Sequence, residues 1–420
     1  MSAQLESRHP GSRPRIFTRE IDSKKAIVLS FIAFLFTGFQ CAIYGMLTVP
    51  IAEHFNIDAN IIIFYDGFGL WGQILAMATG GMIIHRIKGK NTLMLAASLM
   101  IIGSLVSIMA PNVYIYTLMT FLCNMAVGYV LVACNYMIMG TVKSEGESEG
   151  RLSILNVFFS LGFLVSAFVV GNILFYSSWQ LVFILVMLLF VVFIFLLLSL
   201  GIHELCEAAV EHKNKGTRQR RHSDFLTFPV ILTALALFCI VYVEQIMNYF
   251  NQPHMHYDLG FSMQSVGMLV AVYTAAQLIG RAAFGKFLLP YVKIHRYLII
   301  SSLLFALAMI VYIFTQSFFA VALLMAMLGL CDSCIYPSVL GYGMDQLNKV
   351  SSGATSFLVT VGAIGIPIGT SLSGILGATF GRYTAITLGP VLLVLLALLI
   401  FIVSRMRNQT ALAGAQAYAK

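Results

Sequence analysis

Residues 179–200 read WQLVFILVMLLFVVFIFLLLSL and contain no Asp, Glu, Lys or Arg. A helix needs about 20 apolar residues to cross the hydrocarbon core of a bilayer, which is about 30 Å thick. This segment meets that requirement in both length and composition. It predicts a membrane-spanning α-helix, and the same requirement can be applied to the rest of the chain.

Applied outward in both directions, the length criterion predicts eleven further spans. Before this segment they lie at 26–50, 61–84, 92–110, 113–141 and 152–175. After it they lie at 227–251, 262–289, 297–315, 318–342, 352–379 and 383–404. The composition agrees, because 59% of the 420 residues are hydrophobic and only 10% are charged, with a mean hydropathy of +0.90. These values exclude a soluble domain and predict an all-α, polytopic membrane protein of twelve transmembrane helices.

The basic residues give the chain a formal net charge of +8 and fall in short clusters between the predicted spans. Lys and Arg near span ends are retained in the cytoplasm. All clusters but one lie on the side of the amino terminus, at Arg86 to Lys90, Lys143 and Arg151, Lys213 to Arg221, Lys286 to Arg296, Lys349, and Arg405 and Arg407; the exception is Arg382. We therefore expect an inner-membrane protein with both termini cytoplasmic. Because membrane topology explains the basic charge, we expect no nucleic-acid partner.

The longest polar stretch divides the predicted spans into two sets of six. It contains KNKGTRQRR and is typical of a solvated linker. We therefore predict five parts. They are a cytoplasmic tail at 1–25, a six-helix bundle at 26–201, a cytoplasmic linker at 202–226, a second six-helix bundle at 227–405 and a cytoplasmic tail at 406–420.

Two loops in corresponding places of the halves resemble each other. The first reads GMIIHRIKGK at 81–90, with Gly81, His85, Arg86 and Gly89 at its key positions. The second reads GRAAFGK at 280–286, with Gly280, Arg281 and Gly285. Both resemble the loop motif of the major facilitator superfamily, in which glycines let helices approach and cations hold the turn at the cytoplasmic surface. The resemblance implies two pseudo-symmetric six-helix bundles, with Arg281 expected as a topology anchor rather than a ligand.

Two longer stretches resemble the fucose permease-like branch of that superfamily. They are GLCDSCIYPS at 329–338 and GRLSILNVFFSLG at 150–162. Within the branch, the likeness to the TsgA-type bacterial proteins covers nearly the whole chain. It implies a secondary active transporter of a small solute that works by alternating access, with proton coupling, around a cavity between spans one, four, seven and ten. The acidic positions of the branch in spans one and four are occupied here by Met46 and Leu131.

Acidic residues within the predicted spans are candidates for a substrate or proton site. An ionisable side chain at mid-membrane costs about 2.5 to 3.5 kcal/mol on insertion scales, so it needs a partner, water or a function. Glu244 shares one helical stripe with Asn248, and both can face one aqueous cavity. Asp332 lies near the middle of its span, one turn before Tyr336. A structural hydrogen bond to a neighbouring helix is the alternative for each acid.

Uncharged polar residues form a second group of candidates for the same site. Gln40 and Tyr44 share a face of the first span, and Asn124 and Asn135 share a face of the fourth. Such residues can line a cavity, but hydrogen bonds between helices, worth about 0.6 kcal/mol, are an equally common use.

Asp66 and Gln73 form a possible gate in the second span. Because Asp66 lies only a few residues inside the outer end of that span, we favour an interfacial carboxylate that reaches water. His254 and His256 have the chemistry of metal ligands but are expected in a solvated loop, so no metal site is predicted.

Other functions remain as alternatives to import of a small solute. One is an exporter of amphipathic or siderophore-like compounds, and another is a membrane receptor or assembly factor that keeps the transporter fold without moving solute. No nucleophile–base pair and no phosphate-binding loop occur, so neither an enzyme nor a cofactor is expected. The expected partners are a small-molecule substrate, protons and the lipid bilayer, with the chain as a monomer.

Overall fold

The computed structural model describes residues 20–141, 145–201, 227–283, 291–346 and 352–418. Nearly all of the predicted amino-terminal tail, the predicted linker and Gly285 lie outside the described residues. Within those ranges every regular element is a helix. This agrees with the all-α fold expected from the length and spacing of the apolar runs.

Five helices form the N-terminal half. They are α1 (Glu20–Phe55), α2 (Ala59–Ile108), α3 (Val113–Met139), α4 (Glu145–Tyr176) and α5 (Gln180–Ser199). With 50 residues, α2 has enough for two membrane crossings of about 20 residues each. Its backbone is non-helical at Lys88, where φ is 69°, so the second and third predicted spans meet at this break.

The C-terminal half contains the remaining helices. They are α6 (Phe228–Tyr249), α7 (Asn251–Pro253), the π-helical turn η3 (His254–Asp258), α8 (Met263–Ala283), α9 (Ile294–Ile313), α10 (Phe318–Asp332), α11 (Ile335–Met344), α12 (Ser352–Phe380) and α13 (Arg382–Tyr418). The break between α10 and α11 divides one predicted span at Ser333 and Cys334. Within the described residues, eleven helical segments are long and apolar enough to cross a membrane. Counting α2 twice gives the twelve predicted spans.

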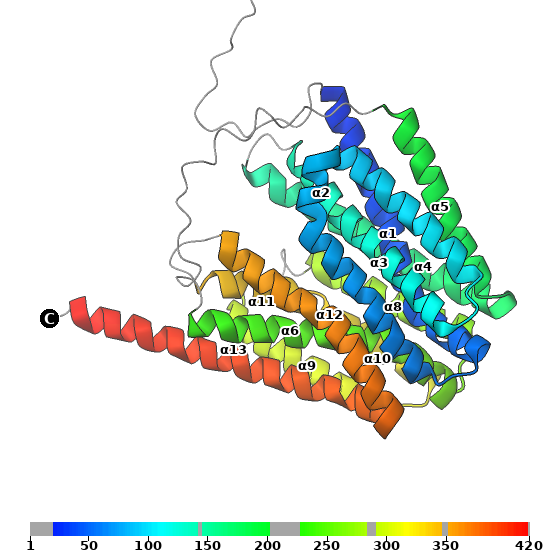
Figure 1. Ribbon diagram of the computed structural model, residues 1–420. Helices are drawn as coiled ribbons and strands as arrows, with labels where there is room; N and C mark the ends of the chain where they lie inside the picture. The colour runs from blue at the N-terminus through cyan, green and yellow to red at the C-terminus, as the bar shows by residue number, and fades with distance from the viewer. Residues whose placement is uncertain (1–19, 142–144, 202–226, 284–290, 347–351, 419–420) are drawn as a thin grey trace, which may run out of the picture.

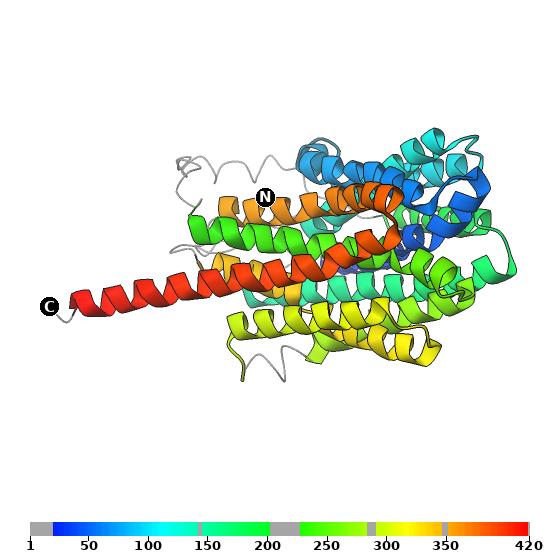
Figure 2. The same ribbon diagram turned by 90° about the horizontal axis from the view of Figure 1, so that it is seen from below.

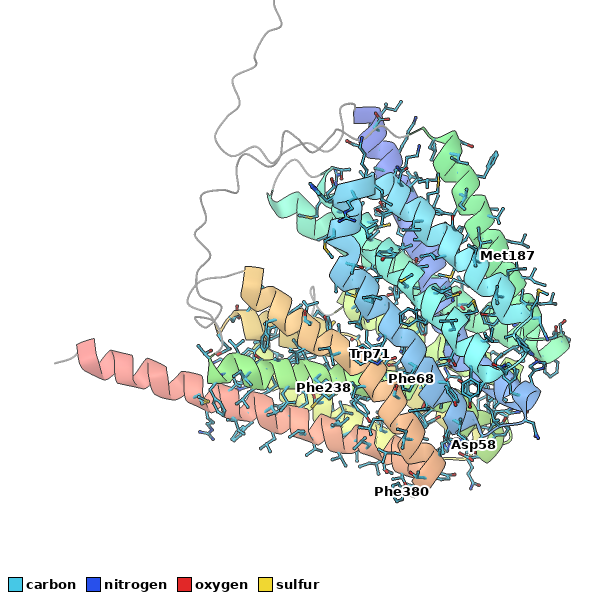
Figure 3. All side chains as sticks on the ribbon, in the orientation of Figure 1. Asp58, Phe68, Trp71, Met187, Phe238 and Phe380 are labelled. Atoms are coloured by element: carbon cyan, nitrogen blue, oxygen red, sulfur yellow. The ribbon has the colours of Figure 1, made fainter. Side chains whose placement is uncertain are left out.

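The two halves lie side by side and meet most closely at one end of the molecule (Figures 1 and 2). Asp58, just before α2, and Phe380, at the end of α12, mark this closed end (Figure 3). The ribbons of the halves diverge toward the opposite end, where α1 and α6 begin (Figure 1).

Glycines allow the halves to touch at the closed end. A Cβ atom on Gly67 of α2 would lie 2.1 Å from Ser371 Oγ of α12, and one on Gly374 of α12 would lie 2.5 Å from the backbone nitrogen of Phe64 of α2. No real Cβ atom fits at such distances, so only glycine permits this packing.

Large apolar side chains cover the outer surface of the bundles (Figure 3). On α5, for example, Leu188, Val192 and Phe195 are each more than half exposed. Continuous apolar surface of this kind is unfavourable in water and favourable against acyl chains. The outer surface therefore fits a lipid bilayer.

Candidate functional site

A cavity of about 130 Å³ lies between four helices, one from the N-terminal half and three from the C-terminal half. Helix α4 contributes from the first half, and α6, α8 and α10 contribute from the second. The lining residues are Phe159, Ser160, Phe163, Glu244, Asn248, Tyr273, Thr274, Gln277, Arg281 and Asp332. The sequence led us to expect spans one, four, seven and ten; the residues that line the cavity come instead from spans five, seven, eight and ten.

Helix α6 brings a carboxylate and an amide to the cavity. Glu244 and Asn248 lie one turn apart and both line it, as their i, i+4 spacing on one helical face requires. Glu244 is close to the middle of the apolar segment Phe228–Asp258. Asn251, three residues after Asn248, lies beyond the end of α6 and is buried, with its Nδ2 donating to the Met247 sulfur.

Asp332 is held at the point where α10 ends. Its side chain is 1% exposed, and its Oδ2 accepts hydrogen bonds from the Tyr273 hydroxyl at 2.6 Å and from Gln277 Nε2 at 2.8 Å. Within the described part of the chain, its Oδ1 is buried without a hydrogen-bond partner. Two neutral donors therefore fix one oxygen, while the other remains available for a proton.

Arg281 links the two halves beside the cavity. Its Nε donates to the backbone carbonyl of Ser333 at 3.0 Å, and its Nη1 donates to Ser160 Oγ of α4 at 2.9 Å. The break after α10 turns the Ser333 carbonyl toward α8. A Cβ atom on Gly280 would lie 2.5 Å from Ser333 Oγ, so this glycine lets α8 approach the break. From the sequence we expected Arg281 to act as a topology anchor. In the structure it also lines the cavity and bonds to both halves.

The charges in the cavity are close enough to interact. Glu244 is within electrostatic reach of both Asp332 and Arg281, and Tyr336 of α11 is within reach of Glu244. Two carboxylates against one guanidinium leave one uncompensated negative charge when all three groups are ionised. Such a site favours binding one proton, or a polar solute with a positively charged group.

The polar candidates of spans one and four lie away from this cavity, in the packing of the N-terminal half. Gln40 is buried on α1, and its Nε2 donates to the Tyr44 hydroxyl at 2.8 Å. Asn124 is buried on α3, and its Nδ2 donates to the Thr120 carbonyl at 2.9 Å. Asn135, also on α3, is exposed. Gln40 and Asn124 therefore bond within their own helices.

The possible gate residues lie on α2. Asp66 is 2% exposed, so the expectation that it reaches water is wrong. Its burial arises because α12 of the other half packs against α2 at the adjacent residue, Gly67. Gln73 is half-buried two turns further along α2. Its backbone carbonyl oxygen packs close to Gly128 of α3.

The first loop motif surrounds the break in α2. Gly81, His85 and Arg86 are exposed before it, and Gly89 is buried directly after Lys88. A Cβ atom on Gly81 would meet nothing within 4 Å. Close helix packing, the role implied by the resemblance, therefore does not apply at Gly81.

Six of the cavity residues were not predicted from the sequence. These are Phe159, Ser160, Phe163, Tyr273, Thr274 and Gln277. Tyr273, Gln277 and Arg281 are spaced by four residues and form one polar stripe on α8. That spacing was a signal in the sequence. The two phenylalanines gave none, because apolar side chains are equally common on surfaces that face lipid.

Comparisons with known proteins agree with this architecture. The family model of the Major Facilitator Superfamily matches residues 29–250 and 233–417. A protein TsgA homolog from Buchnera aphidicola subsp. Schizaphis graminum (strain Sg) is 22% identical over 389 residues, which cover 90% of this chain and 95% of that protein.

Solved structures show the same fold. The nucleoside transporter NupG has a TM-score of 0.74 and 15% identity, over 91% of this chain and 99% of that one. A D-xylose–proton symporter has a TM-score of 0.71 and 16% identity, over 90% and 97% of the two chains. At these identities the likeness shows the fold alone.

Proposed function

Since this chain belongs to the major facilitator superfamily, a group of transporters rather than enzymes, we propose that it is a secondary active transporter that moves a small solute by alternating access, coupled to protons. One observation carries the proposal. Two acidic side chains from different helices, Glu244 and Asp332, converge with Arg281 on one cavity near the middle of the apolar segments. Burying an ionisable side chain at this depth costs free energy, and such residues within transmembrane segments typically mark substrate or proton pathways.

The closed end of the molecule supports a rocking motion of the two halves. We assign this end to the outer side of the membrane, because Arg86 and Lys90 flank the break at Lys88, about 30 residues along α2 and at the opposite end of the molecule, and basic residues favour the cytoplasm. Both termini are then cytoplasmic. The proposed rocking units are 26–201 and 227–405, and the functional unit is a monomer, since one chain supplies the whole cavity.

Each charged residue has a distinct proposed role. Glu244 binds the proton or a positively charged group of the solute. Asp332 takes up a proton at its free Oδ1 while Tyr273 and Gln277 hold its Oδ2. Arg281 bonds to both halves, so its contact with Ser160 must change as they move apart. When Glu244 and Asp332 are protonated, the cavity can close around them without water; when both are ionised, it cannot. Protonation therefore shifts the equilibrium between the two arrangements of the halves.

The proposal is tested first by solute binding. A cognate solute stabilises the purified protein by RT ln(1 + [L]/Kd), so we expect small polar solutes with a positively charged group to raise its Tm. Glu244→Gln and Asp332→Asn should each abolish that shift and gradient-driven uptake into liposomes. Asp345→Asn, a carboxylate exposed at the end of α11, is the matched control. Unchanged uptake in both cavity variants would remove these acids from the mechanism.

A second candidate is export of amphipathic compounds, favoured by the apolar wall that Phe159 and Phe163 form on one side of the cavity. In the same screen, amphipathic compounds would then raise the Tm and small polar solutes would not. A receptor or assembly factor on this fold would show no flux of any solute that binds.

A further inference from the structure

Asp66 is a buried acidic residue outside the cavity. It lies in the first part of α2, at the closed end, and is 2% exposed. By distance and angle, neither of its carboxyl oxygens has a hydrogen-bond partner among the described residues, although the Tyr116 hydroxyl lies close enough to donate a weak hydrogen bond. This differs from the usual state of a buried carboxylate, which is paired or hydrogen-bonded because an isolated buried charge is very unfavourable.

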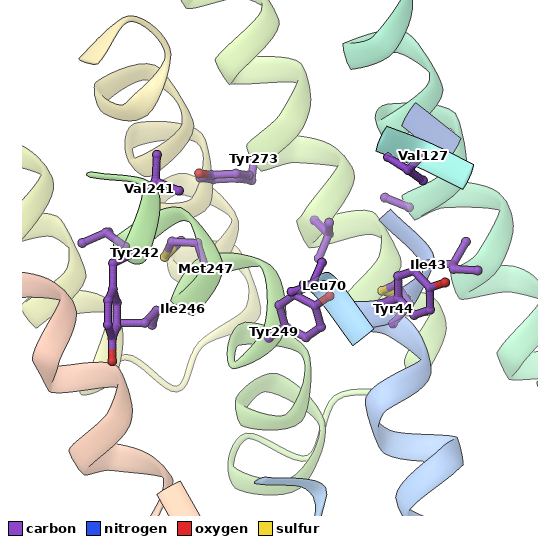
Figure 4. Packing of buried hydrophobic residues seen from close by; sticks show 14 of the residues in the cluster. Ile43, Tyr44, Leu70, Val127, Val241, Tyr242, Ile246, Met247, Tyr249 and Tyr273 are labelled. Carbon is purple, nitrogen blue, oxygen red and sulfur yellow. The ribbon is translucent and has the colours of Figure 1, made fainter. Parts of the chain in front are cut away.

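The groups around Asp66 come from both halves and carry no positive charge. Tyr116 of α3, Tyr44 of α1 and Tyr249 of α6 are within electrostatic reach of it. Figure 4 shows Tyr44 and Tyr249 on either side of the α2 segment that carries Leu70, one turn beyond Asp66. The thiols of Cys41 and Cys123 lie near these tyrosines.

No Lys, Arg or His takes part in the interactions found for Asp66 within the described chain. Tyrosine hydroxyls and cysteine thiols are uncharged near neutral pH. The surroundings of Asp66 therefore offer an ionised carboxylate no cation and at most one weak hydrogen-bond donor, the Tyr116 hydroxyl.

The backbones of the two halves meet immediately beside Asp66. A Cβ atom on Gly67, the next residue, would lie 2.1 Å from Ser371 Oγ, and one on Gly45 of α1 would lie 1.9 Å from the Asn248 carbonyl oxygen of α6. These contacts exclude water from the seam between the halves. Because Tyr249 and Ser371 belong to the other half, separation of the halves here would expose Asp66.

We infer that Asp66 is a second proton-binding site, which must be protonated when the halves are closed at this end and is ionised when they separate. The inference rests on the proposed alternating-access function. The ionised carboxylate needs water or a cation, which the closed seam does not provide; the neutral carboxyl group needs neither. The proton enters from the compartment that the opened seam faces. Closure at this end then depends on the pH of that compartment.

The closed seam binds one proton more than the open seam, so lowering the pH favours closure. For a single proton, the closed-to-open ratio changes by up to about tenfold per pH unit. Glu244 and Asp332 lie in the separate cavity and are not needed for this response.

The test is a distance measurement across the closed end. Spin labels on genetically encoded azido side chains at Ser178 and Gln316, exposed positions after α4 and after α9, leave the native cysteines in place. Electron paramagnetic resonance then gives the populations of short and long distances in lipid nanodiscs, between about pH 5.5 and about pH 8.5. We expect the short-distance population to fall as the pH rises.

Asp66→Asn should hold the short distance at every pH, because the amide is a neutral isostere of the protonated acid. Asp58→Asn, at the exposed N-cap of the same helix, should respond like the wild type. A wild-type population that does not change with pH, or an Asp66→Asn protein that responds like the wild type, would overturn the inference. If Asp66→Asn does not fold, a seam that does not respond to pH in the Glu244→Gln, Asp332→Asn double variant would overturn it as well.

The Glu244→Gln, Asp332→Asn double variant separates this inference from the proposed function. It should keep the pH response of the seam although it does not transport. Loss of the seam response with transport still dependent on Glu244 would refute the Asp66 site alone. Normal transport in the double variant would refute the proposed cavity mechanism alone.

Discussion

Asp332 and Asp66 are both almost fully buried, at 1% and 2% exposure, but their surroundings differ. Asp332 accepts hydrogen bonds from Tyr273 and Gln277 and lies beside a cavity with Arg281. Asp66 is enclosed by tyrosines where the halves touch. A carboxyl group with hydrogen-bond donors beside it can gain or lose a proton without a change in the surrounding structure. A carboxyl group with no cation and at most one weak donor beside it ionises only if the structure opens.

Helix α6 joins the two regions. The Asn248 side chain lines the cavity, while its backbone carbonyl packs against Gly45 at the closed seam. The next residue, Tyr249, lies within electrostatic reach of Asp66. A shift of α6 therefore affects the cavity and the seam together, so a solute in the cavity and a proton at the seam can influence each other through one rigid helix.

The largest effect is expected from a substitution that holds the seam apart. Gly67→Val places side-chain atoms where Ser371 Oγ already lies, so the halves cannot close and solute uptake into liposomes should fall to background. Gly81→Val, on the same helix with open space around it, should transport normally. Equal uptake in the two variants would contradict the role of the seam.

A smaller effect is expected in the cavity. Tyr273→Phe removes the hydroxyl that donates to Asp332, and one hydrogen bond to a charged group is worth about 1.5 to 3 kcal/mol. We expect solute affinity, measured by titration calorimetry, to weaken by about tenfold or more, with the seam response to pH unchanged. Tyr176→Phe, at an exposed tyrosine, is the control. An altered seam response in Tyr273→Phe without added solute would show that Asp332 takes part in the pH response of the seam.

The smallest effects distinguish two glutamines of opposite halves. Gln277→Leu removes a donor to Asp332 in the cavity and should weaken solute affinity several-fold. Gln40→Leu removes a bond within α1 and should change only stability, by about 0.6 kcal/mol in thermal unfolding. The reverse pattern would place the solute near the α1 candidates.

The spans and the two cavity acids could be predicted from the sequence because each leaves a local signal. A run such as 179–200 is recognisable by length alone, and an acid such as Glu244 or Asp332 is conspicuous within an apolar run. The break after Asp332 also has a local signal, which the continuous apolar run obscured: Pro337 has no backbone N–H to donate to the carbonyl of Ser333, four residues earlier.

The remaining features depend on packing between distant segments. Arg281 has the sequence position of a topology anchor, and only the approach of α8 to α10 brings it to the cavity. The depth of Asp66 in its span suggested contact with water, but α12 covers it. Gln40 and Asn124 have the composition of cavity residues and instead bond within their own helices.

Proton movement that accompanies solute entry tests the central claim most directly. Liposomes containing the purified protein and an enclosed pH-sensitive dye would receive a solute that raises its Tm, without any imposed gradient. The proposed mechanism predicts a pH change inside wild-type liposomes and none with Glu244→Gln or Asp332→Asn. Solute entry with no pH change in the wild type, or an equal pH change in all three proteins, would contradict it.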